Sequence, residues 1–198
     1  MIFTSVVGSN NSSKGPTYVP PIFRALHAQN MKPEILTNIP ESGSIAEVRF
    51  DASGDCTWVK FQDSDYIDWA GVFGHGWGGG QDALQNANGI AFVLSNGQGY
   101  VVNVNSRTLL SKTECDYLKK VISCRNTNIF VAATDTDLRV YSDKGLIFTT
   151  DRVASDGINL NSCGKGVVAG EVWGFDKWYS FTLDTTKQKY ECSWSCPL

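Results

Sequence analysis

Residues 90–104 read Ile-Ala-Phe-Val-Leu-Ser-Asn-Gly-Gln-Gly-Tyr-Val-Val-Asn-Val, two apolar runs joined by Asn96 and Gly97. Asn and Gly tolerate the positive φ angles of a two-residue turn, so Asn-Gly between apolar runs is a strong hairpin signal. We therefore predict an antiparallel pair of strands over residues 90–94 and 100–104.

Similar signals on both sides of this hairpin predict three more. The predicted pairs are 45–50 with 56–61 through Ser53-Gly54, 129–133 with 138–141 through Asp135-Thr136-Asp137, and 167–173 with 178–183 through Gly174-Phe175-Asp176. Further outer strands are expected over 146–150 and 188–192. The turns recur at intervals of 43, 39 and 39 residues. Such a period is typical of repeat architectures with one four-stranded sheet per unit.

The pattern over residues 44–190 resembles the blades of β-propellers, although the Trp-Asp and Gly-His signatures of the best-known blade family do not occur in register. The resemblance implies a mainly β fold of antiparallel hairpin repeats of about 40 residues, closed or partial. A β-sandwich is the alternative, because any antiparallel sandwich produces hairpins at similar spacing.

Two short helices are expected beside the strands. One covers residues 22–31. The other lies near residues 112–122, where Ser111 and Glu114 form a capping box before apolar residues at helical spacing. The chain is expected to be a single domain over 1–198, with an N-terminal strand, loop and helix over 1–43 and four hairpin units over 44–198.

Composition excludes several classes of protein. A net charge of −3 and a pI near 5.3 argue against direct nucleic-acid binding. No apolar run approaches the length of a membrane span, and no signal peptide is apparent, so no membrane association and a cytoplasmic location are expected. The six cysteines are then expected to be free thiols. Neither a metal site nor a cofactor is predicted.

No motif predicts catalysis. The run from Gly74 to Gly80 lacks the Gly-Lys-Ser/Thr ending of a phosphate-binding loop. The acids around Asp63 do not continue as a calcium loop, and His75 has no sequence partner that would make it a general base. We therefore expect no catalytic residues and no enzyme.

Charge is concentrated between residues 41 and 82, which hold eight acidic and two basic residues, a net charge of −6. Aromatic residues lie in the same stretch, and aromatic anchors beside clustered acids are typical of a surface for a basic protein. The candidate partner-binding residues are Asp63, Asp65, Tyr66, Asp68, Trp69, His75, Trp77 and Asp82. A solvated acidic loop with aromatics in the core is the alternative.

In overall profile the chain is similar to bacterial immunity proteins, which bind and neutralise a partner toxin, as in contact-dependent growth inhibition. The resemblance implies a basic toxin, a nuclease, whose cleft faces Asp63, Asp65 and Asp68 while Trp69 and Trp77 anchor the contact. A monomer, or a heterodimer with the toxin, is expected. Two alternatives stay open: a carbohydrate or small-ligand binding module, and a phage structural protein.

Overall fold

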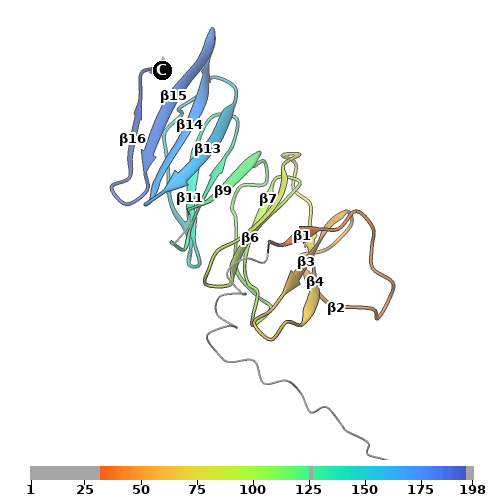
Figure 1. Cartoon of the computed structure of the whole chain (residues 1–198). Coiled ribbons are helices and arrows are strands. Elements are labelled where there is room, and N and C mark those ends of the chain that lie inside the picture. Colours follow the sequence, from red (N-terminus) through yellow and green to blue (C-terminus); the bar gives the residue numbers. More distant parts are fainter. Residues whose placement is uncertain (1–31, 125–126, 195–198) are drawn as a thin grey trace, which may run out of the picture.

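The computed structural model describes residues 32–124 and 127–194, which form sixteen β-strands in four sheets of four strands (Figure 1). Within these residues the chain forms no helix, and so none that is long and apolar enough to span a membrane. The fold is therefore mainly β, as the hairpin repeats predicted.

The strands follow one another along the chain, and each sheet comes from one continuous stretch. Sheet 1 contains β1 (Glu34–Ile35), β2 (Ala46–Phe50), β3 (Cys56–Gln62) and β4 (Asp68–Gly74). Sheet 2 contains β5 (Gln81–Gln85), β6 (Ile90–Ser95), β7 (Gln98–Asn103) and β8 (Thr108–Lys112). Sheet 3 contains β9 (Lys120–Cys124), β10 (Ile129–Ala133), β11 (Leu138–Ser142) and β12 (Gly145–Thr149). Sheet 4 contains β13 (Ile158–Gly164), β14 (Val167–Gly174), β15 (Lys177–Asp184) and β16 (Lys189–Cys192).

Sheets 2, 3 and 4 are antiparallel meanders in which each strand pairs with the next. The hairpins predicted at 90–104, 129–141 and 167–183 are confirmed, as are the outer strands β12 and β16. At the central turn, Asn96 and Gly97 both have positive φ, at 46° and 98°. This is the conformation that made Asn-Gly a hairpin signal.

Sheet 1 departs from this pattern and corrects the first predicted hairpin. Strand β3 pairs with β1 on one side and with β4 on the other, so β2 has no free edge of β3 to join. It pairs instead with β4, in parallel, from Ala46 beside Trp69 to Phe50 beside Phe73. The prediction was wrong because β4, a nearly continuous buried run, was not predicted as a strand.

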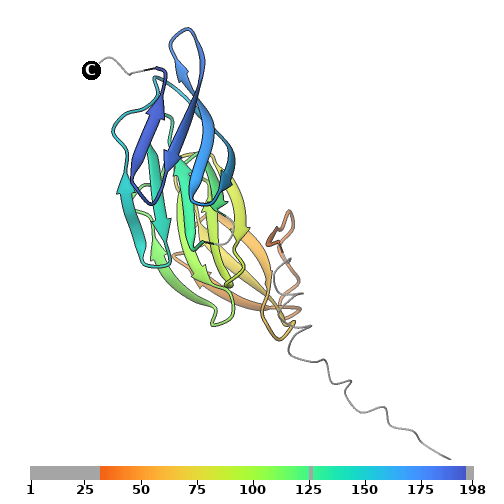
Figure 2. The same ribbon diagram turned by 60° about the vertical axis from the view of Figure 1, so that its left-hand side comes forward.

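The four sheets lie side by side in chain order (Figures 1 and 2), with sheets 1 and 4 at opposite ends of the molecule in both views. The first strands β1, β5, β9 and β13 each contact the next one along this row. The array is therefore open at both ends, like part of a propeller.

Three apolar clusters form the core, one at each junction between successive sheets. Phe61, Trp69 and Phe73 meet Tyr100 between sheets 1 and 2. Phe92 meets Phe130 and Tyr141 between sheets 2 and 3, and Val140 lies with Val172 and Phe181 between sheets 3 and 4. Within the described residues no cluster joins sheet 1 to sheet 4.

The helix predicted near 112–122 is absent, which corrects that expectation. Strand β8 continues to Lys112 and β9 begins at Lys120, with an irregular segment between them. Cys115 and Leu118 are buried because this segment crosses the junction of sheets 2 and 3. Apolar residues three positions apart, which suggested a helix, are here buried by a segment without regular secondary structure. The helix predicted over 22–31 lies outside the described residues.

The cysteines are only partly as expected. Cys124 on β9 and Cys163 on β13 form a disulfide, with their Cα atoms 4.9 Å apart, that joins sheets 3 and 4. Cys56, Cys115 and Cys192 are free thiols. The expectation of free thiols throughout rested on the cell compartment inferred from the sequence, which carries no information on which side chains meet.

Candidate functional site

One end of the array carries all the segments that lead from one sheet to the next, together with the tight turns between the two middle strands of sheets 2, 3 and 4. We call this surface the connector face; it comprises residues 75–80, 96–97, 113–119, 134–137, 150–157 and 175–176. Backbone hydrogen bonds bind these segments to one another across sheet boundaries. The N–H of Trp77 donates to Asp116 O at 2.6 Å, and that of Gly157 donates to Asp135 O at 2.7 Å.

The glycine-rich segment of the connector face is a close backbone contact and not a phosphate-binding loop. An added Cβ at Gly76 or Gly78 would lie within 2.6 Å of backbone atoms in the 113–119 segment. The N–H groups of Gly76 and Gly78 donate to Ser95 O and Asn96 O, at 3.0 and 2.9 Å. The glycines therefore allow this segment to lie wedged between the neighbouring backbones.

Aromatic side chains project from these fixed segments. Trp77 is 87% exposed, Phe175 69% and Tyr117 46%. Such exposure is costly for large apolar groups and commonly marks a surface that meets a partner. Tyr117 is held by Arg139, whose guanidinium carbon lies 5.7 Å from the ring centroid, and the amide of Phe175 donates to Ser155 Oγ at 3.1 Å.

The connector face is also acidic. Its segments contain seven acidic residues and two basic ones, a net charge of −5 in a chain whose total is −3. Lys119, one of the two basic residues of these segments, is paired with Asp135, its Nζ 3.5 Å from Oδ2. Arg139 of β11 compensates one further acid, since its Nε lies 2.9 Å from Asp137 Oδ1. The remaining excess is exposed beside the aromatic side chains.

Four of the predicted site residues lie at the other end of the array: Asp63, Asp65 and Tyr66 in the turn between β3 and β4, and Asp68 at the start of β4. There the carboxylate of Asp63 accepts the N–H groups of Asp65 and Ile67 and forms a 2.9 Å ion pair with Arg107. Burial by itself would raise the pKa of Asp63. The Arg107 guanidinium and the two amides lower the pKa by more than burial raises it, so the pKa lies below its usual value. Asp63 therefore holds the turn together.

Asp68 is likewise committed to internal contacts. Lys60 Nζ lies 2.7 Å from its carboxylate and Gln62 donates a hydrogen bond to it, and both contacts lower the pKa of Asp68. Asp65 and Tyr66 are exposed, and Tyr66 borders a small cavity of about 140 Å³ between the turns of sheets 1 and 2. Of the three acids predicted for the site in this region, Asp65 alone has no such contact among the described residues.

The other four predicted residues are divided between the core and the connector end. Trp69 is fully buried and donates from Nε1 to Val104 O at 3.1 Å, so it is not accessible to a partner. His75 Nε2 lies 3.2 Å from Thr57 Oγ1, in a hydroxyl network that joins sheets 1 and 2. Asp82 accepts the amide of its neighbour Ala83.

The predicted set is therefore not one site. Strand β4 separates the turn at Asp63 from Trp77, and its seven residues span roughly 23 Å. The sequence pointed to Trp77 but missed Tyr117 and Phe175 as exposed aromatics. Phe175 offered a signal, since it occupies the tip of a predicted tight turn, where a side chain has little to pack against.

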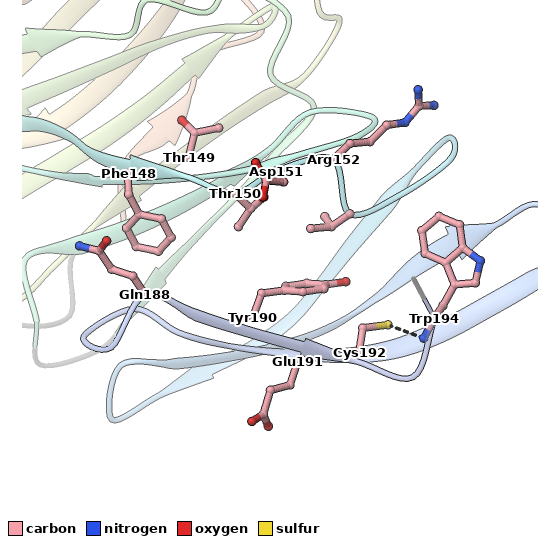
Figure 3. A pocket seen from close by; sticks show the side chains of 11 residues that line it. Phe148, Thr149, Thr150, Asp151, Arg152, Gln188, Tyr190, Glu191, Cys192 and Trp194 are labelled. Atoms are coloured by element: carbon pink, nitrogen blue, oxygen red, sulfur yellow. Dashed lines mark hydrogen bonds between the residues drawn. The ribbon is translucent and has the colours of Figure 1, made fainter. Parts of the chain in front are cut away.

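A second hollow lies between the outer strands of sheets 3 and 4 (Figure 3), with a volume of about 630 Å³. Phe148 and Thr150 form one wall, and Tyr190, Cys192 and Trp194 form the other. Burial raises the pKa of Tyr190, whose hydroxyl is covered and has no hydrogen-bond partner among the described residues. The size is that of a pocket for a ligand or a short segment of chain.

The described residues contain no group of three or more His, Cys, Asp or Glu side chains placed to hold a metal ion. The ring of His75 faces the hydroxyl group of Thr57.

No protein-family model and no curated protein matches the chain. Among solved structures it is similar to Hsv2 of Kluyveromyces lactis, at 16% identity and a TM-score of 0.44 over 67% of this chain and 43% of that one. It is also similar to two computationally designed proteins. Ika8 gives 14% identity and a TM-score of 0.42 over 58% of this chain and 37% of that one, and Ika4 gives 13% and 0.37 over 80% and 94%. The chain thus spans less than half of Hsv2 and of Ika8, and similarity at this level assigns no family.

Proposed function

We propose that this chain is a non-catalytic protein-binding module that docks on its partner through the connector face. The observation that carries the proposal is that the side chain of Trp77 is 87% exposed. Its own segment is held in place by backbone hydrogen bonds to Ser95 and Asn96 on one side and to Asp116 on the other. An exposed aromatic on a rigid support loses little conformational freedom on binding, so its burial contributes directly to affinity. Tyr117 and Phe175 extend the same surface.

The partner we propose is a basic protein. The net charge of −5 over the connector segments attracts a positively charged surface, which accelerates association and favours basic partners over acidic ones. Binding should therefore weaken as ionic strength rises, since added salt screens exposed charges.

The finer form of the proposal is that the chain is a bacterial immunity protein that neutralises a nuclease toxin. An acidic, aromatic face can cover the basic cleft that binds the phosphates of a nucleic acid. In this form the acids of the connector face take the role first assigned to Asp63, Asp65 and Asp68. The carboxylates of Asp63 and Asp68 are engaged with Arg107 and Lys60.

The test compares two exposed aromatics at opposite ends of the molecule. Immobilised full-length chain, Trp77→Ala and the matched control Tyr66→Ala are used to capture proteins from the source cell, and any captured protein is purified and titrated at several salt concentrations. We expect Trp77→Ala to weaken binding at least tenfold and Tyr66→Ala to leave it unchanged.

Either of two results contradicts the proposal. Loss of binding in Tyr66→Ala alone would assign the interface to the far end, and no partner under any condition would remove the binding function. The finer form is tested by adding the chain to the captured partner in a nuclease assay. An unaffected nuclease, or a partner without nuclease activity, would contradict it.

A further inference from the structure

The groove between sheets 3 and 4 differs from the other junctions in its outer strands. Strands β8 and β12, the outer strands of sheets 2 and 3, contact each other. Strands β12 and β16, the outer strands of sheets 3 and 4, are instead separated by the 630 Å³ hollow of Figure 3. The array therefore opens at this junction.

Two strand edges border the groove. Strand β12 is the last strand of sheet 3 and β16 the last strand of sheet 4. Among the described residues, neither has a backbone partner on its outer side. An unpaired edge presents a row of N–H and C=O groups that a further extended chain can pair with.

The side chains between these edges provide apolar walls. Phe148 points into the groove from β12, while Tyr190 and Cys192 line it from β16. The Tyr190 ring stacks against Phe181 of the neighbouring strand β15, with ring centroids 5.5 Å apart. Trp194 lines the wall directly beyond the end of β16.

We infer that this groove binds an extended peptide segment of another protein, which pairs by its backbone with β16 or β12 and places an apolar side chain between Phe148 and Tyr190. The unpaired edges favour an extended backbone over a compact ligand, because a compact ligand leaves most of the edge groups unused. In an added strand alternate side chains point to opposite faces, so every second residue of the peptide faces the groove.

The groove adjoins the connector face, because Thr150 to Val153 line it and also belong to a connector segment. The strand edges of β12 and β16 lie at the junction of sheets 3 and 4, whereas Trp77 lies on the segment between sheets 1 and 2. Trp77→Ala and Cys192→Trp therefore test the two proposals separately.

The experiment uses a random peptide library displayed on phage, selected against the full-length chain. Cys192→Trp fills the groove from β16, and Cys56→Trp is the matched control, a half-buried free cysteine on a strand of sheet 1. We expect enriched peptides with apolar residues at alternate positions. They should bind the wild type and Cys56→Trp equally and bind Cys192→Trp at least tenfold more weakly.

Hydrogen exchange on the wild type provides a second measurement that does not depend on how the variant folds. Bound peptide should slow amide exchange in β12 or β16. The inference is overturned if no peptide is enriched, if Cys192→Trp binds as well as the wild type, or if protection appears elsewhere. A panel of free sugars is titrated in parallel, and sugar binding at the groove without peptide binding would also overturn it.

Discussion

At the scale of single residues, the main surprise is how many apparent functional groups have structural roles. The glycines of the 74–80 run allow two backbones to touch, and Asp63 organises a turn through two amides and Arg107. Trp77 is different, because its ring has no such role and projects into solvent. Residue type alone does not separate these cases, since the distinction depends on which segments meet.

The first prediction concerns Gly78. An added Cβ would lie 2.5 Å from Leu118 O and from the Tyr117 carbonyl carbon, so Gly78→Ala forces the two segments apart. We expect a loss of about 1 to 3 kcal/mol in the free energy of unfolding, measured by urea denaturation. The control is Gly164→Ala, where an added Cβ meets nothing within 4 Å. Equal effects of the two substitutions would contradict the backbone contact.

The second prediction concerns the pH dependence of stability. Because the folded-state pKa of Asp63 lies below its ordinary value of 3.8, its ionised form stabilises the fold above that pH. The stabilisation then declines as pH falls through the lowered folded value. We expect Asp63→Ala to cost about 2 kcal/mol at neutral pH through its lost charged hydrogen bonds, and much less in strong acid.

Urea denaturation across a pH series checks the prediction for Asp63, with Asp65→Ala as the control from the same turn. Asp65 is exposed and its carboxylate has no hydrogen bond or ion pair among the described contacts. A cost for Asp63→Ala that stays constant down to the lowest pH would show that the charge of Asp63 is not what stabilises the turn.

At the scale of elements, local signals predicted the strands better than their partners. The hairpin at Asn96-Gly97 could be predicted because its turn chemistry and both apolar runs are adjacent in sequence. The parallel partner of β2 could not, because nothing between Phe50 and Trp69 marks a parallel crossover. The capping box at Ser111 predicted a helix that does not form. Here the local signal is outweighed by packing, because Leu118 is buried in the cluster between sheets 2 and 3.

The candidate site was less predictable than the fold. Asp63 and Trp77 were placed on one predicted surface because they are close in sequence. Strand β4 lies between them, so they are at opposite ends of sheet 1. Surface residues from different segments of the connector face, such as Tyr117 and Phe175, share a face only because the sheets stack in register. That arrangement has no local signature in the sequence.

The third prediction concerns the disulfide between β9 and β13. Cys124 and Cys163 are 39 residues apart, and closing a loop of that length stabilises a fold by about 4 kcal/mol in the chain-entropy model. Reductant should therefore lower the free energy of unfolding of the wild type by about 2 to 4 kcal/mol. The double variant Cys124→Ser/Cys163→Ser should be insensitive to reductant. Recovery of both cysteines as free thiols by peptide mapping in the oxidised protein would refute the bond.

At the scale of the whole molecule, the structure is a row of sheets that each contact only their neighbours. At its far end, the face of sheet 4 opposite the buried Val172 and Phe181 is mixed: it carries Glu171, Ser180 and Thr182 beside the paired rings of Trp173 and Trp178. Stability in such an array is a sum over junctions.

The fourth prediction follows from this arrangement. Phe61→Ala removes a buried ring from the junction of sheets 1 and 2, at a cost of about 3 to 5 kcal/mol. Native-state hydrogen exchange should show the loss of protection concentrated in sheets 1 and 2. Sheet 4, which shares no cluster with them among the described residues, should keep most of its protection. Uniform loss in all four sheets would mean that the array unfolds as one cooperative unit.

The parallel pairing of β2 with β4 has a consequence for how the chain is made. Residues 46–50 leave the ribosome before β3 and β4, yet their neighbour in the sheet is the strand synthesised last of the three. Until β4 emerges, β2 has no strand with which to pair. In sheet 1, β3 and β4 must therefore pair first, and β2, made earlier, then joins the edge of β4. In each later sheet, every strand can pair with the one made just before it as translation proceeds.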